Sequence, residues 1–448
     1  MRSILIMHEH FNCLRDENMK KSNQFATSFL AQPLVAPVTL AILSAISTLS
    51  VAETVQSLEP VVVTATRVNQ PLSEAASSIT VVSEKEIAQT QPLTFSEILD
   101  TIPNVDTTSS TSVMYNRVSI RGSQPNQITY LIDGMRQDDL TMYGNGGIGG
   151  TLALETKSAA DFLADSDKDF GALVKVGYGS DSISWSKSAY AFGRSDMWDV
   201  VAGVTRRDSG AAKTSYKGLR STADVDNDST SVFIKATLSP TDNNAATLSY
   251  AYDIAHNDSE KGARFDSYRY EQHRIIGQWE YELDEFINLK TGLQYAQSNF
   301  NFENNVPRIF KDKFESFSGN FQNTSRFELF GRHDLTYGLD FSRTEQSGLT
   351  KDSGEWADDT SRPDAEGLDA GVFIEDQYKL TNYLAIAPQL RWSYFKRQSN
   401  ADYPSLSDSK LTPGVTVKLT PIEEVMFWGS VTTGYRPPIL DEMYFRMD

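Results

Sequence analysis

The sequence predicts an all-β transmembrane barrel over residues 170–448, preceded by a smaller domain of mixed α and β structure. Three observations support this prediction. Short polar turns recur roughly every 40 to 50 residues from residue 170 onward, and long polar loops alternate with them. The strands between alternate apolar with polar residues, and aromatic residues gather near the strand ends. These features are typical of outer-membrane barrels, whose short turns face the periplasm and whose long loops face outside.

The turns and loops set the expected strand boundaries. Tight turns are predicted at Gly193–Asp196, Pro240–Asn244, Leu283–Glu285, Gly331–His333, Leu380–Asn382 and Pro421–Glu424. Outer loops are predicted at 207–230, 254–269, 299–314, 345–367 and 396–410. About 13 strands of roughly 10 residues remain, and an odd number cannot close an up-and-down antiparallel barrel. The sequence therefore predicts a partial barrel.

The strand 246–253 shows the two expected faces. Successive side chains of a strand point to opposite sides, so every second residue shares a face. The predicted lipid face holds Ala246, Leu248, Tyr250 and Tyr252, and the predicted lumen face holds Thr247, Ser249, Ala251 and Asp253. A soluble β-sandwich alternates in the same way. The strand length, the aromatic residues at strand ends and an export signal favour the membrane.

Composition excludes several classes of protein. The chain has 448 residues, which predicts at least two structural units. A mean hydropathy of −0.38 with 22% charged residues excludes a helical membrane protein. A net charge of −18 argues against nucleic acid as a partner, because no basic field is available for phosphates. The chain has no Gly-x-Ser-x-Gly motif or paired zinc-spacing histidines beyond the export signal, so we do not expect an enzyme.

The amino-terminal part reads as a targeting segment. Residues 34–52 form the long apolar stretch of the chain and end on the small residues Ser50, Val51 and Ala52. We interpret 19–52 as a signal peptide starting at Met19, and 1–18 as an untranslated or non-native upstream segment outside the fold. Cys13, the one cysteine, lies in that segment, so the mature chain is expected to have neither a disulfide nor a thiol nucleophile.

The region between the signal peptide and the barrel has short elements of both kinds. Glu59–Arg67 contains a β-branched run that is either a strand for a partner's sheet edge or the first strand of the domain. Helices are expected at Ser83–Gln89 and Thr94–Thr101, and strands at Arg117–Arg121 and Ile128–Asp133. Gly134 makes the turn after the last of these.

Several segments, in order, resemble the plug of a TonB-dependent outer-membrane receptor. They are Glu59–Arg67, Ile79–Val82, Thr101–Val105, Val118–Gly122, Tyr130–Gln137 and Tyr143–Thr156. The barrel resembles the same family at Val372–Tyr378, Leu390–Trp392 and Gly434–Phe445. The last block is similar to the Phe-Arg-Ala-Pro box of haem and haemoglobin receptors, with Tyr435 in place of Phe and Pro437 in place of Ala.

The resemblance implies an outer-membrane importer of haem, taken from haemoglobin or another host protein and energised by TonB. It implies three domains: a periplasmic segment with a TonB box at 53–67, the plug at 68–165 and a partial barrel at 170–448. Complete barrels of the family have roughly 22 strands. It implies three sets of site residues: a TonB box of Pro60, Val61, Val62, Val63 and Thr64; a plug motif of Arg121, Gly122, Asp133, Gly134 and Arg136; and a ligand-loop box of Tyr435, Arg436, Pro437 and Pro438. Arg121 matches a family arginine that pairs with barrel glutamates. Haem would be cargo, with no permanently bound cofactor or metal.

The chain also departs from the family pattern. Only Asp138–Met142 follow Gln137 where the family has a further plug strand, so the plug is expected to be shortened there. The chain is interpreted as a fragment or truncated product. His256, in a predicted outer loop, is the one geometric candidate for a haem ligand. Two alternatives stay open: a receptor for a siderophore or transferrin iron, and a passive porin or surface adhesin.

Overall fold

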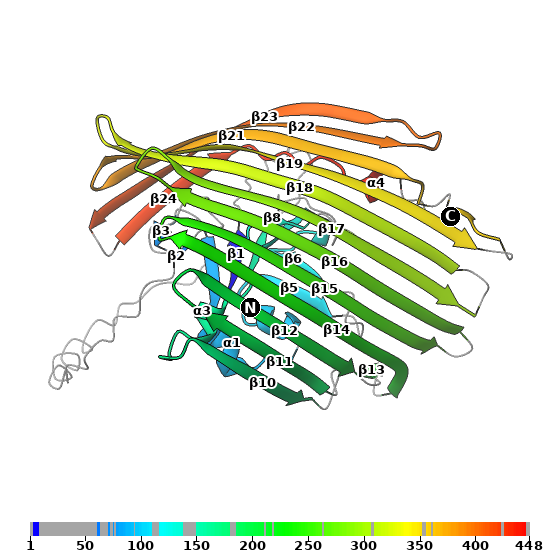
Figure 1. The fold of residues 1–448 in the computed structure, drawn as a ribbon. Helices are drawn as coiled ribbons and strands as arrows, with labels where there is room; N and C mark the ends of the chain where they lie inside the picture. Colours follow the sequence, from blue (N-terminus) through cyan, green and yellow to red (C-terminus); the bar gives the residue numbers. More distant parts are fainter. Residues whose placement is uncertain are drawn as a thin grey trace, which may run out of the picture. The chain divides into compact units, whose positions relative to one another are not determined.

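The computed structural model of the chain describes residues 3–8, 61–62, 70–71, 75, 78–93, 95–109, 116–137, 149–179, 185–209, 212–216, 219–261, 264–305, 309–351, 355–359, 362–422 and 425–444. Its main element is a 15-stranded antiparallel sheet in which 13 strands are paired in chain order (Figure 1). This confirms the predicted fold class and strand number.

The strands of this path are long. They are β10 (Phe170–Tyr178), β11 (Trp185–Arg194), β12 (Trp198–Ser209), β14 (Leu219–Thr241), β15 (Asn244–Lys261), β16 (Arg264–Glu282), β17 (Asn288–Asn304), β18 (Ile309–Glu328), β19 (Arg332–Lys351), β21 (Ala365–Thr381), β22 (Leu384–Ser399), β23 (Leu406–Ile422) and β24 (Val425–Thr432). Two short strands lie off the path: β13 (Ala212–Tyr216) pairs with β14, and β20 (Ala357–Asp358) pairs with β19.

All six tight turns fall where the sequence predicted them, between the paired strands from β11–β12 to β23–β24. The predicted long loops were wrong in extent. Strands β14 and β15 stay paired as far as Asp224 and Glu260, and β15 and β16 as far as Lys261 and Arg264. Because the outer halves of these strands are polar on both faces, their sequence looks like a loop. The backbone nevertheless keeps its ladder hydrogen bonds above the apolar band.

The sheet has the two faces that the alternation predicted. Leu248 is 60% exposed and its chain neighbour Ser249 only 6%. Large apolar residues are exposed on the same face of neighbouring strands, among them Ile234, Leu238, Ile275, Val372 and Val417. A continuous exposed apolar face of this kind is a lipid-contacting surface. The opposite face carries Lys235, Gln278 and Gln294, which contact the amino-terminal domain.

That domain, the plug, has a five-stranded sheet of its own. The strand order is β4 (Ser78–Ser83), β1 (Ser3–His8), β9 (Gly150–Glu155), β7 (Ile128–Ile132) and β8 (Met135–Arg136). The other elements are α1 (Glu84–Thr90), α2 (Phe95–Leu99), β5 (Val105–Ser109), β6 (Asn116–Ile120), the short 3-10 helix η2 (Pro125–Gln127) and α3 (Ala159–Phe162). The predicted helices and strands of the plug are therefore confirmed, and Ser83 caps α1 through a capping box with Glu86.

The plug has its own apolar core. Leu99, Ile120, Ile128 and Leu152 are fully buried in one cluster, to which α2, β6, β7 and β9 each contribute. Burial of these side chains stabilises the plug, and every residue of the cluster comes from the plug itself. The left-handed turn at Asp133 and Gly134, with φ of 48° and 72°, then reverses the chain from β7 into β8.

The expectation that residues 1–18 stand outside the fold was wrong for Ser3–His8. This segment forms β1, which pairs with β4 on one side and with β9 on the other. The physical reason is that an apolar run of strand-forming residues can occupy the space between two strands that are not paired with each other. Whether 1–18 is translated, and whether 19–52 is removed, stay predictions, since residues 9–60 lie outside the described ranges.

Other predicted segments also fall outside the described residues. They include Pro60, Val63, Thr64, Thr94 and the shortened stretch Asp138–Met142. None of the helices in the described part of the chain is long and apolar enough to cross a membrane.

The two faces of β23 provide a direct test of the membrane assignment. Val415 is exposed on the apolar face, whereas Thr416 lies on the face that already carries Lys418. We expect Val415→Arg to lower the free energy of unfolding in lipid vesicles by about 2–4 kcal/mol, the typical cost of an arginine in the bilayer. The matched control Thr416→Arg should change it little. Urea titration measures both, and equal effects would contradict the assignment of the faces.

Candidate functional site

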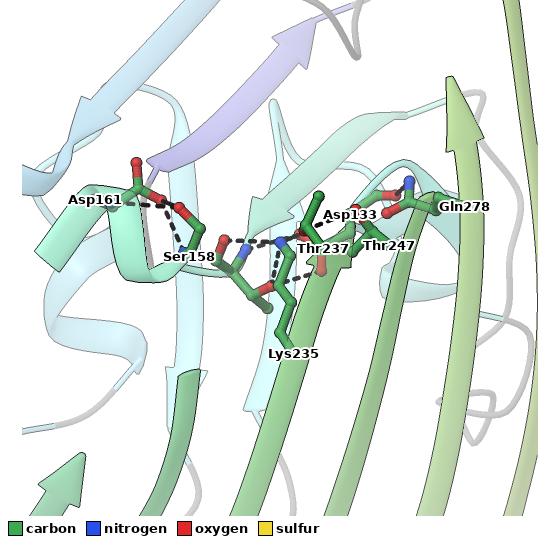
Figure 2. A network of polar contacts seen from close by, with 8 residues as sticks. Asp133, Ser158, Asp161, Lys235, Thr237, Thr247 and Gln278 are labelled. Carbon is green, nitrogen blue, oxygen red and sulfur yellow. Dashed lines mark hydrogen bonds and ion pairs between the residues drawn. The ribbon is translucent and has the colours of Figure 1, made fainter. Parts of the chain in front are cut away.

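Polar contacts join the plug to the inner face of the barrel at the Asp133–Gly134 turn (Figure 2). The Asp133 carboxylate accepts hydrogen bonds from Thr156 N at 2.8 Å and Thr156 Oγ1 at 2.6 Å. Lys235 Nζ, from β14, lies 3.6 Å from Asp133 Oδ1 and donates to Thr156 O and Oγ1. Gln278, from β16, donates to the Asp133 carbonyl oxygen at 2.8 Å. The predicted plug motif residue Asp133 therefore connects the plug to two wall strands.

Two further junctions use hydrogen bonds in the same way. Gln137 Nε2 donates to Gln294 Oε1 at 2.9 Å, and Gln294 Nε2 donates back to the carbonyl oxygen of Arg136 at 2.9 Å. The Asp199 carboxylate of β12 accepts from Ala159 N at 2.8 Å and Ala160 N at 2.6 Å, the first amides of α3. An acidic group at this position satisfies amides that have no partner within the helix.

The ligand-loop box follows β24, the thirteenth strand of the path, at the end of the barrel opposite the short turns. Arg397 Nε donates to Pro438 O at 2.8 Å and thereby fixes the box on β22. Its guanidinium also donates to Leu368 O, to Lys396 O and, through Nη2, to both oxygens of Asp369 at 2.9 and 3.0 Å. Burial, followed by the charge of Asp408, raises the pKa of Tyr435, the first residue of the box.

Glu442 joins the box to the plug. It lies in α4 (Leu440–Tyr444), and its Oε2 accepts from Arg436 Nη1 at 2.7 Å and from Ile439 N at 3.2 Å. Its Oε1 accepts from Asn126 Nδ2 of the plug at 2.7 Å. Burial raises the pKa of Glu442, but the bonds from Arg436, Ile439 and Asn126 more than offset this, so the pKa lies below its ordinary value. Glu442 is therefore a carboxylate at neutral pH.

A buried ion pair lies next to α4. Arg362 pairs with Asp312 of β18, and its Nε lies 3.5 Å from Asp441 Oδ1. Burial raises the pKa of Asp441, and the positive charge of Arg362 opposes this shift. The side chains of Arg362 and Asp312 are 8% and 1% exposed, so this pair is out of reach of a ligand in the outer medium.

A small cavity of about 30 Å³ lies between the box, the plug and the wall. Its lining includes Arg136 from the plug, Arg397 and Gln346 from the wall, and Asp441 from α4. Gln346 Oε1 and Asp441 Oδ1 are buried there without a hydrogen-bond partner in the described structure. A polar cavity of this size accommodates water rather than a larger ligand.

The remaining predicted residues are placed as follows. Arg121 and Gly122 form an exposed left-handed turn, with φ of 53° and 75°, and no ion pair joins Arg121 to a barrel glutamate within the described ranges. Val61 and Val62 form β2, which pairs with β3 (Gln70–Pro71). The part of the chain that is described contains no cluster of three or more His, Cys, Asp or Glu side chains suited to a metal ion.

His256 was expected in an outer loop, and that placement was wrong. It lies within β15, paired with Asp228 on one side and Arg269 on the other. Its Nδ1 is 3.4 Å from Asp228 Oδ2. His256 is eight residues from Leu248 in an unbroken register and therefore shares its outward face. Its role as a haem ligand stays an untested prediction, which this outward position does not favour.

Sequence reasoning missed Asn126, Lys235, Asp199 and Glu442. One of them had a local signal: Glu442 accepts the amide of Ile439, three positions earlier, as in a capping box, and Pro438 lies two residues before α4 begins. The others had none. Asn126 and Glu442 are 316 residues apart in the chain, and polar residues of a lumen face look alike until the register is known.

A lipid-facing antiparallel wall with a plug domain bonded to its inner face defines an outer-membrane β-barrel with a plugged lumen. Residues 219–447, about half of the chain, match the family model of TonB dependent receptor-like β-barrels, and residues 71–161 match that of the TonB-dependent receptor plug domain. The chain belongs to the TonB-dependent receptor family. It is therefore an outer-membrane protein of the Gram-negative type.

Individual relatives are distant. The chain is 24% identical to a hemin receptor of Yersinia enterocolitica over 94% of its own length and 66% of that protein. A shorter stretch, 29% of the chain, is 30% identical to the vitamin B12 transporter BtuB of Vibrio vulnificus. The FrpB iron transporter of Neisseria meningitidis has a similar fold, with a TM-score of 0.68 at 17% identity over 80% of this chain and 63% of that one. The chain thus spans about two thirds of the length of the hemin receptor and of the FrpB transporter.

The Lys235 junction predicts how firmly the plug is held. Removing the ammonium in Lys235→Met leaves the Asp133 carboxylate, 6% exposed, without its cation. Loss of a buried polar partner typically costs about 1–3 kcal/mol. We expect faster hydrogen exchange at residues 128–136 and unchanged exchange in the β18–β19 ladder. The control Lys175→Met, on an exposed strand position, should leave both unchanged. Unaltered plug exchange in Lys235→Met would show that the contact does not hold the plug.

The lowered pKa of Glu442 predicts acid sensitivity of the box. A carboxyl whose pKa is depressed in the folded state stabilises that state above its ordinary pKa, here 4.5, and loses this contribution as the pH falls through the lowered value. Wild type should therefore have a higher urea midpoint than Glu442→Gln at pH 7, and the difference should shrink as the pH falls below 4.5. The charge of Glu442 also contributes to the raised pKa of Asp441, so Glu442→Gln eases the ionisation of Asp441 and makes the difference at pH 7 smaller than the Glu442 carboxylate alone would give. A constant difference across this range would contradict the prediction.

Proposed function

We propose that this chain provides the plug and a large part of the wall of a receptor that imports haem across the outer membrane, with energy supplied through TonB. The observation that supports it best is the similarity to a hemin receptor over nearly the whole chain. The Tyr435–Pro438 box supports the same cargo, because it resembles the box of haem and haemoglobin receptors and lies at the outer end of the barrel.

The plug fits a gated lumen. It has an apolar core of its own, and hydrogen bonds and one ion pair at Asp133, Gln137, Asp199 and Glu442 join it to the wall and the box. Such contacts can be exchanged for water without exposing the core. A pull on the amino-terminal side of the plug can then loosen it while its own fold survives.

The segment Pro60–Thr64 is proposed as the point where that pull is applied. Val61 and Val62 form a short strand whose single described partner is the two-residue β3, so a stronger sheet edge could replace that partner. Addition of a strand to a partner's sheet is an established mode of peptide recognition. TonB would be this partner, and haem from haemoglobin or another host protein would be the cargo at the outer end.

A receptor of the same architecture for another iron source is the second candidate. The FrpB iron transporter shares this fold at 17% identity, so the fold is compatible with this candidate without selecting it. A passive porin is disfavoured by the contacts that tie a folded plug to β12, β14, β16 and β17. An open pore has no use for such a domain.

Deletion of Pro60–Thr64 tests the active mechanism. In a haem-requiring strain that depends on this chain for uptake, we expect growth on haem to stop while the amount of chain in the outer membrane stays the same. Replacement of Thr66–Asn69 by Gly and Ser serves as a control outside the box. Growth on haem that survives the deletion would favour the porin. Growth of the strain with the intact chain on a siderophore but not on haem would favour the second candidate.

A further inference from the structure

The ligand-loop box contains an arginine, Arg436, that is already paired with a carboxylate of the protein. Arg436 Nη1 and Glu442 Oε2 are 2.7 Å apart, with side chains 21% and 27% exposed. A partly exposed pair of this kind is weaker than a buried one because water screens it. An incoming anion of suitable geometry can therefore compete with Glu442 for the guanidinium.

The other two arginines near the box are not open to such competition. Arg397 is 4% exposed and uses its donors on three carbonyl oxygens and both oxygens of Asp369. Arg362 is 8% exposed and faces Asp312 and Asp441. Arg436 is thus the guanidinium among these three that a ligand can reach from the outer side.

Glu442 also accepts a hydrogen bond from the plug. Its Oε1 takes the bond from Asn126 Nδ2, while its Oε2 takes those from Arg436 and Ile439. A ligand carboxylate that bonds Arg436 Nη1 competes with Glu442 Oε2 for that donor, and the like charges of the two carboxylates repel each other. Departure of Glu442 from Arg436 would move both of its oxygens and so weaken the bond to Asn126.

We propose that Arg436 binds a carboxylate of the imported ligand, and that the ligand takes the place of Glu442 there and so releases Asn126 of the plug. The inference rests on the proposed function, because haem carries two carboxylates and would supply the anion. No covalent step is involved: one charge-assisted hydrogen bond is exchanged for another. Occupation of the outer site and loosening of the plug are then linked, and the linkage is reciprocal.

The sign of two substitutions tests this exchange. In absorbance titrations of the full chain in detergent, Arg436→Ala should weaken haem binding about tenfold, as expected for loss of a charge-assisted bond. Glu442→Gln should tighten haem binding about threefold or more, since the competing charge is gone. Haem dimethyl ester, which has no free carboxylate, should bind both variants as it binds wild type. Arg332→Ala, an equal charge change at the periplasmic end, is the control.

A second measurement tests the release of the plug. At saturating haem, amide exchange in residues 116–137 should rise in wild type and stay unchanged in Arg436→Ala. A purely structural role for Glu442 predicts weaker haem binding in Glu442→Gln, the opposite of the tighter binding that we expect. That outcome, or equal losses of haem and ester binding in Arg436→Ala, would overturn the inference alone. Failure of wild type to bind haem at all would overturn the proposed cargo, and the inference with it.

Discussion

The fold depends on one constraint: in lipid, each backbone N–H and C=O must find its partner within the protein. A continuous antiparallel ladder meets this need for strands that are paired on both sides, as β11 to β23 are here, with the tight turns at one end. The alternation of side chains then follows from strand geometry, and it assigns the two faces. Leu248 and Val417 on one face and Lys235 and Gln278 on the other are consequences of the same register.

This constraint also explains what the sequence could and could not predict. Turns were predictable because Gly, Pro, Asn and Asp at the reversals are local signals. The outer loops were predicted too long because above the lipid both faces of a strand contact water, and alternation disappears although pairing continues to Glu260 and Lys261. His256 was misplaced for this reason: it belongs to the polar extension of β15. Strand β1 could not be predicted either, since Ser3–His8 is placed only by its pairing with two strands far along the chain.

The position of the candidate site was predictable, but the contacts between its side chains were not. An odd count of about 13 strands puts the segment after the last one at the end opposite the tight turns, and β24 delivers Tyr435–Pro438 there. The resemblance pointed to Asp133 and Gly134, whose turn is indeed at the wall. The partners Lys235, Gln278, Asp199 and Asn126 came from no motif, because each contact joins residues that only the tertiary fold brings together. A motif marks which residue is used; the register of the wall decides what it meets.

The chemistry of the plug contacts bears on how a gate can be both closed and movable. An apolar plug–wall interface would resist opening, because separation would expose apolar surface to the water that fills the lumen. Apolar contact is present at Phe162, stacked on Phe192 at 4.6 Å, close to the short-turn end of the wall. Near the outer end, Asn126 meets Glu442 through a single hydrogen bond. The plug is therefore anchored by an aromatic contact at one end and by a replaceable polar contact at the other, so loosening that starts at the box can proceed while the anchor still holds.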